Sequence, residues 1–165
     1  VQSQSMLRTA SVLCLLVLAS AGTTPEGLKF LEENKEKEGV VVLPSGLQYK
    51  VLKAAPSGAK SPNVGTPCEC HYRGTLMDGT EFDNSYKRGK PTPLAPKQVV
   101  KGWTEAMQLM GEGDKWQLFL PSELAYGDRQ HGRFITPGAV LVFELEILKV
   151  KGDTEKGTAK IKAEL

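Results

Sequence analysis

The sequence predicts an α+β domain: a twisted antiparallel β-sheet wrapped around one short α-helix, with an N-terminal leader helix before it. Two observations support this. Several segments alternate apolar and polar residues with the period of a β-strand, and one segment, Val100–Met110, repeats apolar residues with helical spacing. The chain has 165 residues, of which 40% are apolar and 24% charged, so it is long enough for one such domain with a real core.

Residues 1–21 have the composition of a secretory signal peptide. Arg8 precedes the apolar run Ala10–Ala19, and the small residues that end at Ala21 are typical of a cleavage site. The run is short for a membrane span, so we expect no stable membrane insertion after cleavage, with an uncleaved anchor as the alternative. Val1–Ser5 are interpreted either as translated sequence upstream of a start at Met6 or as residues added to the natural chain.

Residues 22–42 are expected to form a leader, with a helix over Pro25–Glu38. Thr24 is a suitable N-cap, the following proline suits a first helical turn, and Gly39 ends the pattern. Leu28 and Leu31 give only a weak apolar stripe. Two interpretations therefore stay open: a solvated, fraying arm, or a helix that docks or dimerises.

The sheet is predicted to begin after Leu47, with loops at the segments rich in Pro and Gly. Ala54–Pro67 is one such loop, and Arg88–Pro96 is expected to be irregular. An Asp-Gly pair at Asp78-Gly79 predicts a hairpin turn. We expect strands at Gln48–Leu52, Cys68–Leu76, Glu81-Phe82, Lys115–Leu120 and Val140–Val150.

The predicted helix Val100–Met110 carries its apolar residues at positions i, i+3, i+4 and i+7, beginning at Trp103. This helix is expected to bury one face of the sheet and to leave the other face mostly wet. Trp116 and Phe119, on the strand that follows, are interpreted as core residues.

Residues 152–165 are charged and poor in aromatic residues, which predicts a flexible tail. The tail ends in Lys162-Ala163-Glu164-Leu165, which is similar to the Lys-Asp-Glu-Leu retention signal. Together with a signal peptide, this ending favours the lumen of the endoplasmic reticulum, and a secreted or periplasmic location is the alternative.

Charge and composition exclude several classes of function. A formal charge of +2 does not indicate a nucleic-acid surface, and two histidines without ligand spacing indicate no metal site. No phosphate-binding glycine motif is present, so we expect no cofactor.

Cys68 and Cys70 lie at i and i+2 on one strand, with Cα atoms about 6.5–7 Å apart. That geometry disfavours a disulfide, so both are interpreted as small apolar fillers, and a thiol-active protein is a weaker alternative.

Four motifs occur in order along the chain. Cys70–Ser85 contains the Asp-Gly turn followed by Phe82-Asp83, and Val99–Trp103, Ala125–Gly127 and Gly132–Pro137 come after it. Together they resemble the FK506-binding-protein (FKBP) family of peptidyl-prolyl isomerases, over roughly residues 43–151. The leader is similar to that of the macrophage-infectivity-potentiator branch, in which a longer leader often dimerises. The short leader here favours a monomer, and a dimer through the leader helix stays open.

The resemblance implies a set of site residues. Trp103 corresponds to the floor under the proline ring, Tyr126 to a hydroxyl donor, and Ile135 to a backbone N–H that meets a substrate carbonyl. Asp83 corresponds to a wall carboxylate, which could also hold Arg88 or a tyrosine hydroxyl in place. The expected catalytic residues are Phe82, Asp83, Trp103 and Tyr126, and the expected substrate-binding residues are Tyr72, Val99, Val100, His131, Ile135 and Phe143.

The resemblance further implies an isomerase that accelerates rotation about X-Pro bonds in secretory or exported proteins. The implied partners are proline-containing polypeptides and macrolides of the FK506 type, without metal or cofactor. A chaperone that binds Pro-containing peptides with little turnover is the alternative function. The chain departs from many relatives at Thr92, Leu94 and Thr136, and its charged loop Asp128–Arg133 is also unusual. These departures concern sequence preference beside the proline and affinity for macrolides.

Overall fold

The computed structural model of the protein describes residues 22–152 and 154–155. The predicted signal peptide, Cys14 and the ending Lys162–Leu165 lie outside the described residues. Within the described part of the chain, no helix is long and apolar enough to cross a membrane.

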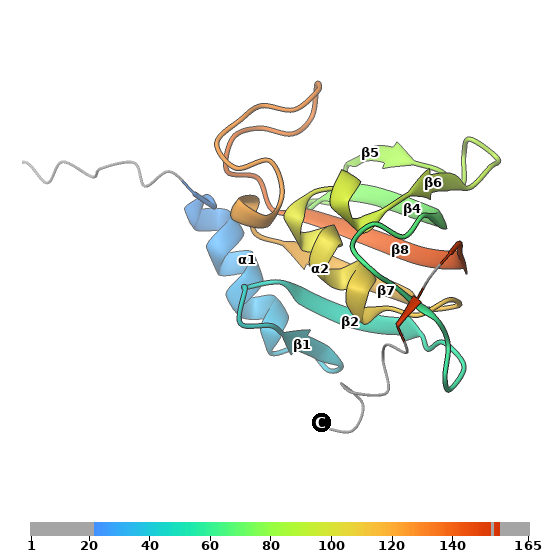
Figure 1. The fold of residues 1–165 in the computed structure, drawn as a ribbon. Helices are drawn as coiled ribbons and strands as arrows, with labels where there is room; N and C mark the ends of the chain where they lie inside the picture. The colour runs from blue at the N-terminus through green and yellow to red at the C-terminus, as the bar shows by residue number, and fades with distance from the viewer. Residues whose placement is uncertain (1–21, 153, 156–165) are drawn as a thin grey trace, which may run out of the picture.

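The centre of the molecule is a seven-stranded sheet in which all pairs of neighbouring strands run antiparallel (Figure 1). The strand order is β1-β2-β7-β8-β4-β5, and β6 also pairs with β4. This arrangement confirms the α+β prediction. The strands are β1 (Val40–Val42), β2 (Gln48–Lys53), β4 (Cys68–Leu76), β5 (Glu81–Asn84), β6 (Thr92–Leu94), β7 (Lys115–Leu120) and β8 (Leu141–Val150).

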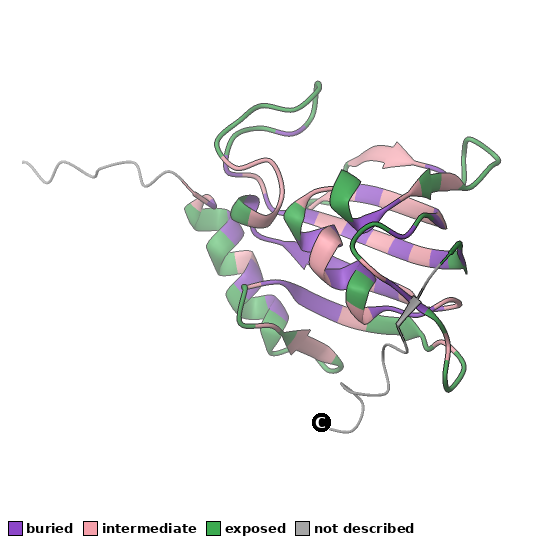
Figure 2. Cartoon of the chain, in the orientation of Figure 1, coloured by how far each residue is buried: buried purple, intermediate pink, exposed green. Residues whose placement is uncertain are grey.

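Helix α2 (Lys101–Leu109) crosses one face of this sheet (Figure 1). Its buried residues Trp103, Ala106 and Met107 join the core formed by the inward side chains of β7 and β8, such as Leu118 and Leu145. Along β8 buried and less buried residues alternate over most of its length (Figure 2), because successive side chains of a strand point to opposite faces. The spacing of apolar residues that predicted these elements therefore matches the spacing of their buried side chains.

Helix α1 (Pro25–Lys35) packs on the opposite face of the sheet. Leu31 is buried with Phe119 of β7 and Val140, and the rings of Phe30 and Phe119 lie 6.2 Å apart. Phe119 points away from α2 because it alternates with Leu118 along the strand. The interpretation of the leader as a solvated arm is therefore wrong. Helix α1 covers only the part of this face around Phe119, and charged side chains farther along it, such as Lys115 and Glu144, stay part-exposed, so the face is mostly wet outside the contact with the helix.

The ends of α1 follow from local chemistry. The Thr24 hydroxyl accepts a hydrogen bond from the Gly27 N–H at 3.1 Å, which confirms the predicted N-cap. The helix ends at Lys35, three residues before the predicted end, because the chain turns there and the Lys37 N–H bonds the Asn34 carbonyl at 3.0 Å.

A pair of buried amides joins α1 to β2. Asn34 Nδ2 donates to Gln48 Oε1 at 2.9 Å, and Gln48 Nε2 donates to the Leu31 carbonyl at 2.9 Å. Both side chains are almost fully buried, at 1% and 4% exposed. Gln48 therefore accepts from one residue of α1 and donates to another where water is excluded, which specifies how the leader helix sits on the sheet.

Several short elements were not predicted. They are β1, β6, the two-stranded pair β3 (Ser61–Pro62) and β9 (Thr154–Glu155), and the 3₁₀ helices η1 (Pro96–Gln98) and η2 (Ser122–Leu124). Two or three residues give too little periodicity for a prediction. The pairing of β9 with β3 corrects the expectation that the whole tail from residue 152 is flexible, at least for Thr154–Glu155.

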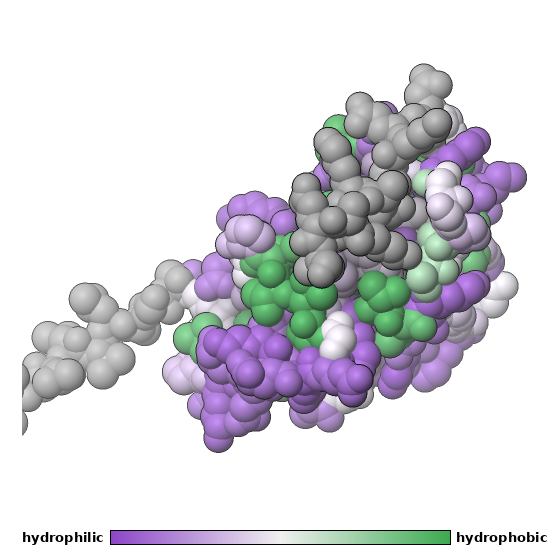
Figure 3. All heavy atoms as spheres, turned by 90° about the horizontal axis from the view of Figure 1, so that it is seen from below, coloured by the Kyte–Doolittle hydropathy of each residue, from purple (hydrophilic) through white to green (hydrophobic). Residues whose placement is uncertain are grey.

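Strand β1 and the neighbouring β2 form one edge of the sheet, with Val42, Val51 and Leu52 exposed. Figure 3 views the molecule from this side, where apolar spheres gather in clusters among hydrophilic ones. A short edge strand of this kind offers few unpaired backbone groups to another chain.

Cys68 and Cys70 are free thiols, and neither side chain is exposed. Burial raises the pKa of Cys68 to about 11 and that of Cys70 to about 12. Both thiols thus stay protonated at neutral pH, where a thiol is a poor nucleophile. The interpretation as small apolar core residues is confirmed.

Candidate active site

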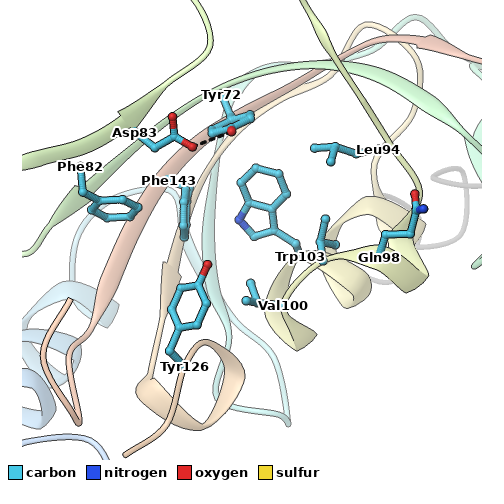
Figure 4. Close-up of a pocket in the computed structure, with 10 residues that line it drawn as sticks. Tyr72, Phe82, Asp83, Leu94, Gln98, Val100, Trp103, Tyr126 and Phe143 are labelled. Atoms are coloured by element: carbon cyan, nitrogen blue, oxygen red, sulfur yellow. Dashed lines mark hydrogen bonds between the residues drawn. The ribbon is translucent and has the colours of Figure 1, made fainter. Parts of the chain in front are cut away.

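A cavity of about 380 Å³ opens between the N-terminus of α2, the strands β4, β5 and β8, and the turn after η2 (Figure 4). It brings together every residue predicted as catalytic and several of those predicted to bind substrate. The lining residues are Tyr72, Phe82, Asp83, Leu94, Gln98, Val99, Val100, Trp103, Tyr126 and Phe143.

Trp103 lies at the base of this cavity and is only 4% exposed. Tyr72 packs against it edge-to-face with ring centroids 5.1 Å apart, and Phe143 does so at 5.0 Å from another side. Phe82 continues the series, 5.6 Å from Phe143 and almost perpendicular to it. Edge-to-face contacts of this kind fix ring orientations, so the cavity has rigid aromatic walls.

Gly74 makes room for two of these rings. A Cβ at this position would lie 2.7 Å from Phe82 and 2.8 Å from Phe143. Gly74 pairs with Phe143 on one side of β4 and with Asp83 on the other. The glycine in the motif thus lets two aromatic side chains meet above the strand.

Asp83 is held in a fixed orientation by its neighbours. Its Oδ2 accepts a hydrogen bond from the Tyr72 hydroxyl at 2.6 Å (Figure 4), and its Oδ1 accepts one from Arg88. Arg88 also donates to the Tyr72 hydroxyl at 2.8 Å, and its guanidinium lies over the Tyr72 ring. The expectation that this carboxylate holds Arg88 or a tyrosine in place is confirmed for both.

Asp83, Tyr72 and Arg88 each keep a single charge state near neutral pH. Burial acts to raise the pKa of Asp83, but the hydrogen bonds from Tyr72 and Arg88 outweigh it, so the pKa lies below its usual value. Burial, with the hydrogen bond to Asp83, raises the pKa of Tyr72. At neutral pH the wall therefore carries a carboxylate paired with a guanidinium and a neutral phenol.

Tyr126 faces the cavity from the turn that follows η2. Its hydroxyl points into the space between Phe143 and Trp103 (Figure 4), and it makes no hydrogen bond to any other described residue. Burial, together with the charge of Asp83, raises its pKa. The His131 ring stacks on Tyr126 with centroids 3.9 Å apart, which places His131 behind this wall. Tyr126 therefore presents a neutral donor that is free to bond a ligand.

Val99 and Val100 form the rim next to α2. The Thr104 hydroxyl donates to the Pro96 carbonyl at 2.6 Å, which ties η1 to the first turn of the helix. The Val100 carbonyl accepts from the N–H groups of Trp103 and Thr104, both at 3.0 Å. The rim and the floor thus move as one unit with the helix.

Comparison with known proteins agrees with this geometry. A family model described as "FKBP-type peptidyl-prolyl cis-trans isomerase" matches residues 58–148, more than half of the chain. The chain belongs to this family. A second model, "Domain amino terminal to FKBP-type peptidyl-prolyl isomerase", matches residues 18–51. The family and the enzyme class predicted from the sequence are therefore confirmed.

Two curated relatives carry names from the macrophage-infectivity-potentiator group. "Macrophage infectivity potentiator" of Trypanosoma cruzi is 46% identical over 134 residues, which are 81% of this chain and 68% of that protein. "Outer membrane protein MIP" of Legionella longbeachae is 48% identical over 126 residues, which are 76% of this chain and 53% of that protein. The chain thus spans between about half and two thirds of the length of these relatives.

A solved structure shows the same fold. The crystal structure of FkpA from Escherichia coli superimposes with a TM-score of 0.72 at 38% identity, over 76% of this chain and 58% of that one. A peptidyl-prolyl cis-trans isomerase from Pseudomonas syringae superimposes with a TM-score of 0.71 at 35% identity, over 77% of this chain and 92% of that one. The FKBP fold of this chain is therefore established from both sequence and structure.

Ile135 does not line the main cavity of this FKBP domain. It is 4% exposed, and its N–H donates to the His131 carbonyl at 3.3 Å across a short β-bridge. Ile135 and His131 instead line an adjoining cavity of about 210 Å³, which shares Phe82, Asp83 and Tyr126 with the first. A substrate carbonyl at Ile135 would have to compete with this bridge.

Leu94 and Gln98 line the cavity but were not predicted as site residues. Leu94 reaches it because β6 pairs with β4, with Thr92 opposite Cys70. Gln98 is held by its Oε1, which accepts from the Ala95 N–H at 3.0 Å. The prolines of Arg88–Pro96 predicted irregular structure, so the short strand β6 that places Leu94 was not predicted.

Within the described residues, no group of three or more His, Cys, Asp or Glu side chains could hold a metal ion.

Proposed function

We propose that the aromatic cavity binds a proline and its flanking residues, and that it accelerates cis-trans rotation of the X-Pro bond. The observation that supports this most is the position of Trp103. It forms a buried floor with aromatic walls on several sides, and the Tyr126 hydroxyl, which has no hydrogen-bond partner among the described residues, points into the same cavity. A flat apolar ring of proline fits such a floor, and a free donor can bond a carbonyl next to it.

The reaction requires no nucleophile. Rotation is slow because the planar amide must lose its resonance, at a barrier of about 18–20 kcal/mol. The twisted amide is less charge-separated than the planar one, so its transfer into an apolar cavity costs less free energy. A differential stabilisation of about 4 kcal/mol would accelerate rotation about a thousandfold.

The residues of the cavity take separate roles in this proposal. Trp103 supports the proline ring, and Phe82 and Phe143 exclude water beside it. Tyr126 donates a hydrogen bond to a substrate carbonyl. Asp83 orients Tyr72 and is not expected to transfer a proton, because its lone pairs already accept from Tyr72 and Arg88.

The proposed substrates are proline-containing polypeptides, and macrolides of the FK506 type are expected to compete for the same floor. The test is isomerisation of a proline tetrapeptide and refolding of a protein limited by proline isomerisation. Acceleration of both, with inhibition by FK506, would support the proposal. Binding of the peptide without acceleration would instead favour the alternative, a chaperone for Pro-containing segments.

We further infer that the protein acts on exported proteins. The composition of residues 10–21 supports this, as does the name of the Legionella longbeachae relative, which places that protein in an outer membrane. The endoplasmic reticulum is the specific compartment that Lys162–Leu165 favours. Expression in a eukaryotic cell with and without these four residues tests it: secretion of the shortened chain alone supports retention, and equal secretion contradicts it.

We also propose that the isomerase domain is a monomer. The apolar face of α1 is occupied by its own sheet through Leu31 and Phe30, and Leu28 is the large apolar residue of this helix left exposed. Sedimentation equilibrium at micromolar concentration tests this, and a dimer that Leu28→Glu dissociates would contradict it.

A further inference from the structure

The first described residues of the leader bind the turn that carries Tyr126. The Thr23 N–H donates to Glu123 Oε1 at 3.0 Å, and the Thr23 hydroxyl donates to Glu123 Oε2 at 2.7 Å. The same hydroxyl accepts from the Ser122 N–H at 2.8 Å. Thr23 and Ser122 are 8% and 1% exposed, so the bond between them is buried, whereas the two bonds to the exposed Glu123 are part-buried. About 100 residues separate the partners along the chain.

Ser122 transmits this contact toward the cavity. Its carbonyl accepts from the N–H of Ala125 at 2.9 Å and from the N–H of Gly127 at 2.8 Å, on either side of Tyr126. The peptide groups around Ser122 are therefore bonded to the leader on one side and to the Tyr126 turn on the other. A shift of Ser122 would move the Tyr126 ring with it.

The leader also contacts the far end of the next loop. The Thr24 N–H donates to the Gly138 carbonyl at 3.0 Å, and the Gly138 N–H donates to the Gly127 carbonyl at 2.8 Å. Gly138 has a φ of +74°, and a Cβ there would lie 2.7 Å from the Gly22 carbonyl, so a side chain does not fit. The loop 127–138, which carries His131, projects from the domain near the start of α1 (Figure 1). Its Gly138 end bonds Thr24 of the leader directly, and its Gly127 end is linked to the leader through Ser122 and Gly138.

The charge of Glu123 favours this arrangement. Burial acts to raise the pKa of Glu123, but hydrogen bonds, among them those from Thr23, outweigh it and the net pKa lies below its usual value. Glu123 forms no salt bridge among the described residues. Its two carboxylate oxygens instead accept hydrogen bonds from Thr23 of the leader. Bonds to a carboxylate are shorter and stronger than bonds between neutral groups.

We propose that Thr23 and Glu123 are positioning residues for Tyr126 and for the loop 127–138. The leader would then help to position an active-site side chain. This inference rests on the proposed function of Tyr126. Among the described residues, Thr23 and Glu123 make no hydrogen bond to a side chain that lines the main cavity, and Ser122 links them to the Tyr126 turn, so their effect is on the placement of the Tyr126 donor.

The experiment compares Thr23→Val, Thr23→Ser and Glu123→Gln in the full chain. Valine keeps the shape and removes the hydroxyl, whereas serine restores it. Glu105→Gln is the matched control, because Glu105 accepts a hydroxyl bond from Ser45 at 2.6 Å at another place. Amide hydrogen exchange is measured at Gly127 and Gly138, and isomerisation of a proline tetrapeptide is measured beside it.

We expect Thr23→Val to speed exchange at both amides about tenfold, which is the effect of losing roughly one hydrogen bond. Thr23→Ser should restore the wild-type rates, Glu123→Gln should give a smaller effect, and Glu105→Gln none. Turnover should fall in Thr23→Val. The same change should lower turnover much less in a Tyr126→Phe background, because the Tyr126 hydroxyl that Thr23 helps to place is then absent.

Two results would overturn the inference. One is unchanged exchange at Gly127 and Gly138 in a folded Thr23→Val protein. The other is an equal loss of turnover with and without the Tyr126 hydroxyl, which would mean that Thr23 acts elsewhere. If the wild type lacked isomerase activity, the proposed function would fail, and the exchange rates would still decide whether the leader orders this turn. If Thr23→Val does not fold, Glu123→Gln gives the same comparison with acceptor geometry largely kept.

Discussion

The Tyr72 hydroxyl donates a hydrogen bond of 2.6 Å to Asp83, so one wall of the aromatic cavity is a ring and a carboxylate that orient each other. Arg88 bonds both of them and completes a closed group of three. The Tyr126 hydroxyl, across the cavity, has no such partner among the described residues. These two walls should therefore respond differently to mutation.

Asp83→Leu is expected to cost more stability than Tyr126→Phe. The leucine leaves the Tyr72 hydroxyl and the Asn84 N–H without their acceptor, which should lower the free energy of unfolding by about 1–2 kcal/mol. Tyr126→Phe removes no hydrogen bond between described residues, so stability should be nearly unchanged while turnover falls about fivefold. Urea denaturation and a peptide assay measure the two effects. The opposite ranking would mean that Asp83 is solvated and dispensable.

Trp103→Leu should weaken binding of proline peptides while the protein stays folded, because the ring support is lost but an apolar side chain remains. Trp103→Ala should instead leave a cavity and cost about 3–5 kcal/mol of stability. Trp116→Leu is the matched control: Trp116 is also buried, but it stacks on Tyr49 at 4.2 Å, away from the site. Equal peptide affinity in the two leucine variants would contradict the floor assignment.

The isomerisation rate should be nearly flat between about pH 6 and 8. Asp83 has a pKa below its usual range, and Tyr72 and Tyr126 have pKa values above theirs, so none changes charge in that window. The measurement is kcat/KM of a proline peptide against pH at constant ionic strength. A bell-shaped profile that disappears in His131→Gln would show that proton transfer takes part, against the desolvation mechanism.

Stability should fall in acid through Asp83. Its pKa is lower in the folded protein than in the unfolded chain, so the ionised group stabilises the fold above about pH 4, and this contribution is lost as the pH drops through the folded pKa. The advantage of the wild type over Asp83→Asn in free energy of unfolding should accordingly be constant near neutrality and shrink below about pH 4. An advantage that grew in acid would contradict this sign.

Asn34→Ala should release the leader helix from the sheet. The change leaves Gln48 Oε1 buried without a donor, which should cost about 1–3 kcal/mol of stability. Gln48→Ala should cost a similar amount, and the double variant should cost less than the sum, because both changes remove the same Asn34–Gln48 hydrogen bond. Thermal unfolding of the four proteins measures this coupling. Strict additivity would mean that the amides act independently.

The local pattern of the chain was enough for the regular elements. Cys68–Leu76 and Lys115–Leu120 have the bounds predicted from alternation, and the helix predicted over Val100–Met110 differs from α2 by one residue at each end. Burial imposes a period on a strand or a helix, and that period is visible in a single sequence. The motif residues that resemble the family likewise come together around the cavity, including Trp103, Asp83 and Tyr126.

The tertiary structure decided the contacts that join distant segments. The docking of Leu31 on Phe119, the arrival of Leu94 at the cavity and the bonds of Thr23 to Glu123 depend on how the chain returns to the same place. A weak apolar stripe, as on α1, does not say which surface will cover it. Periodicity reports which side of an element is buried, whereas the partner on that side is selected only when the whole sheet is assembled.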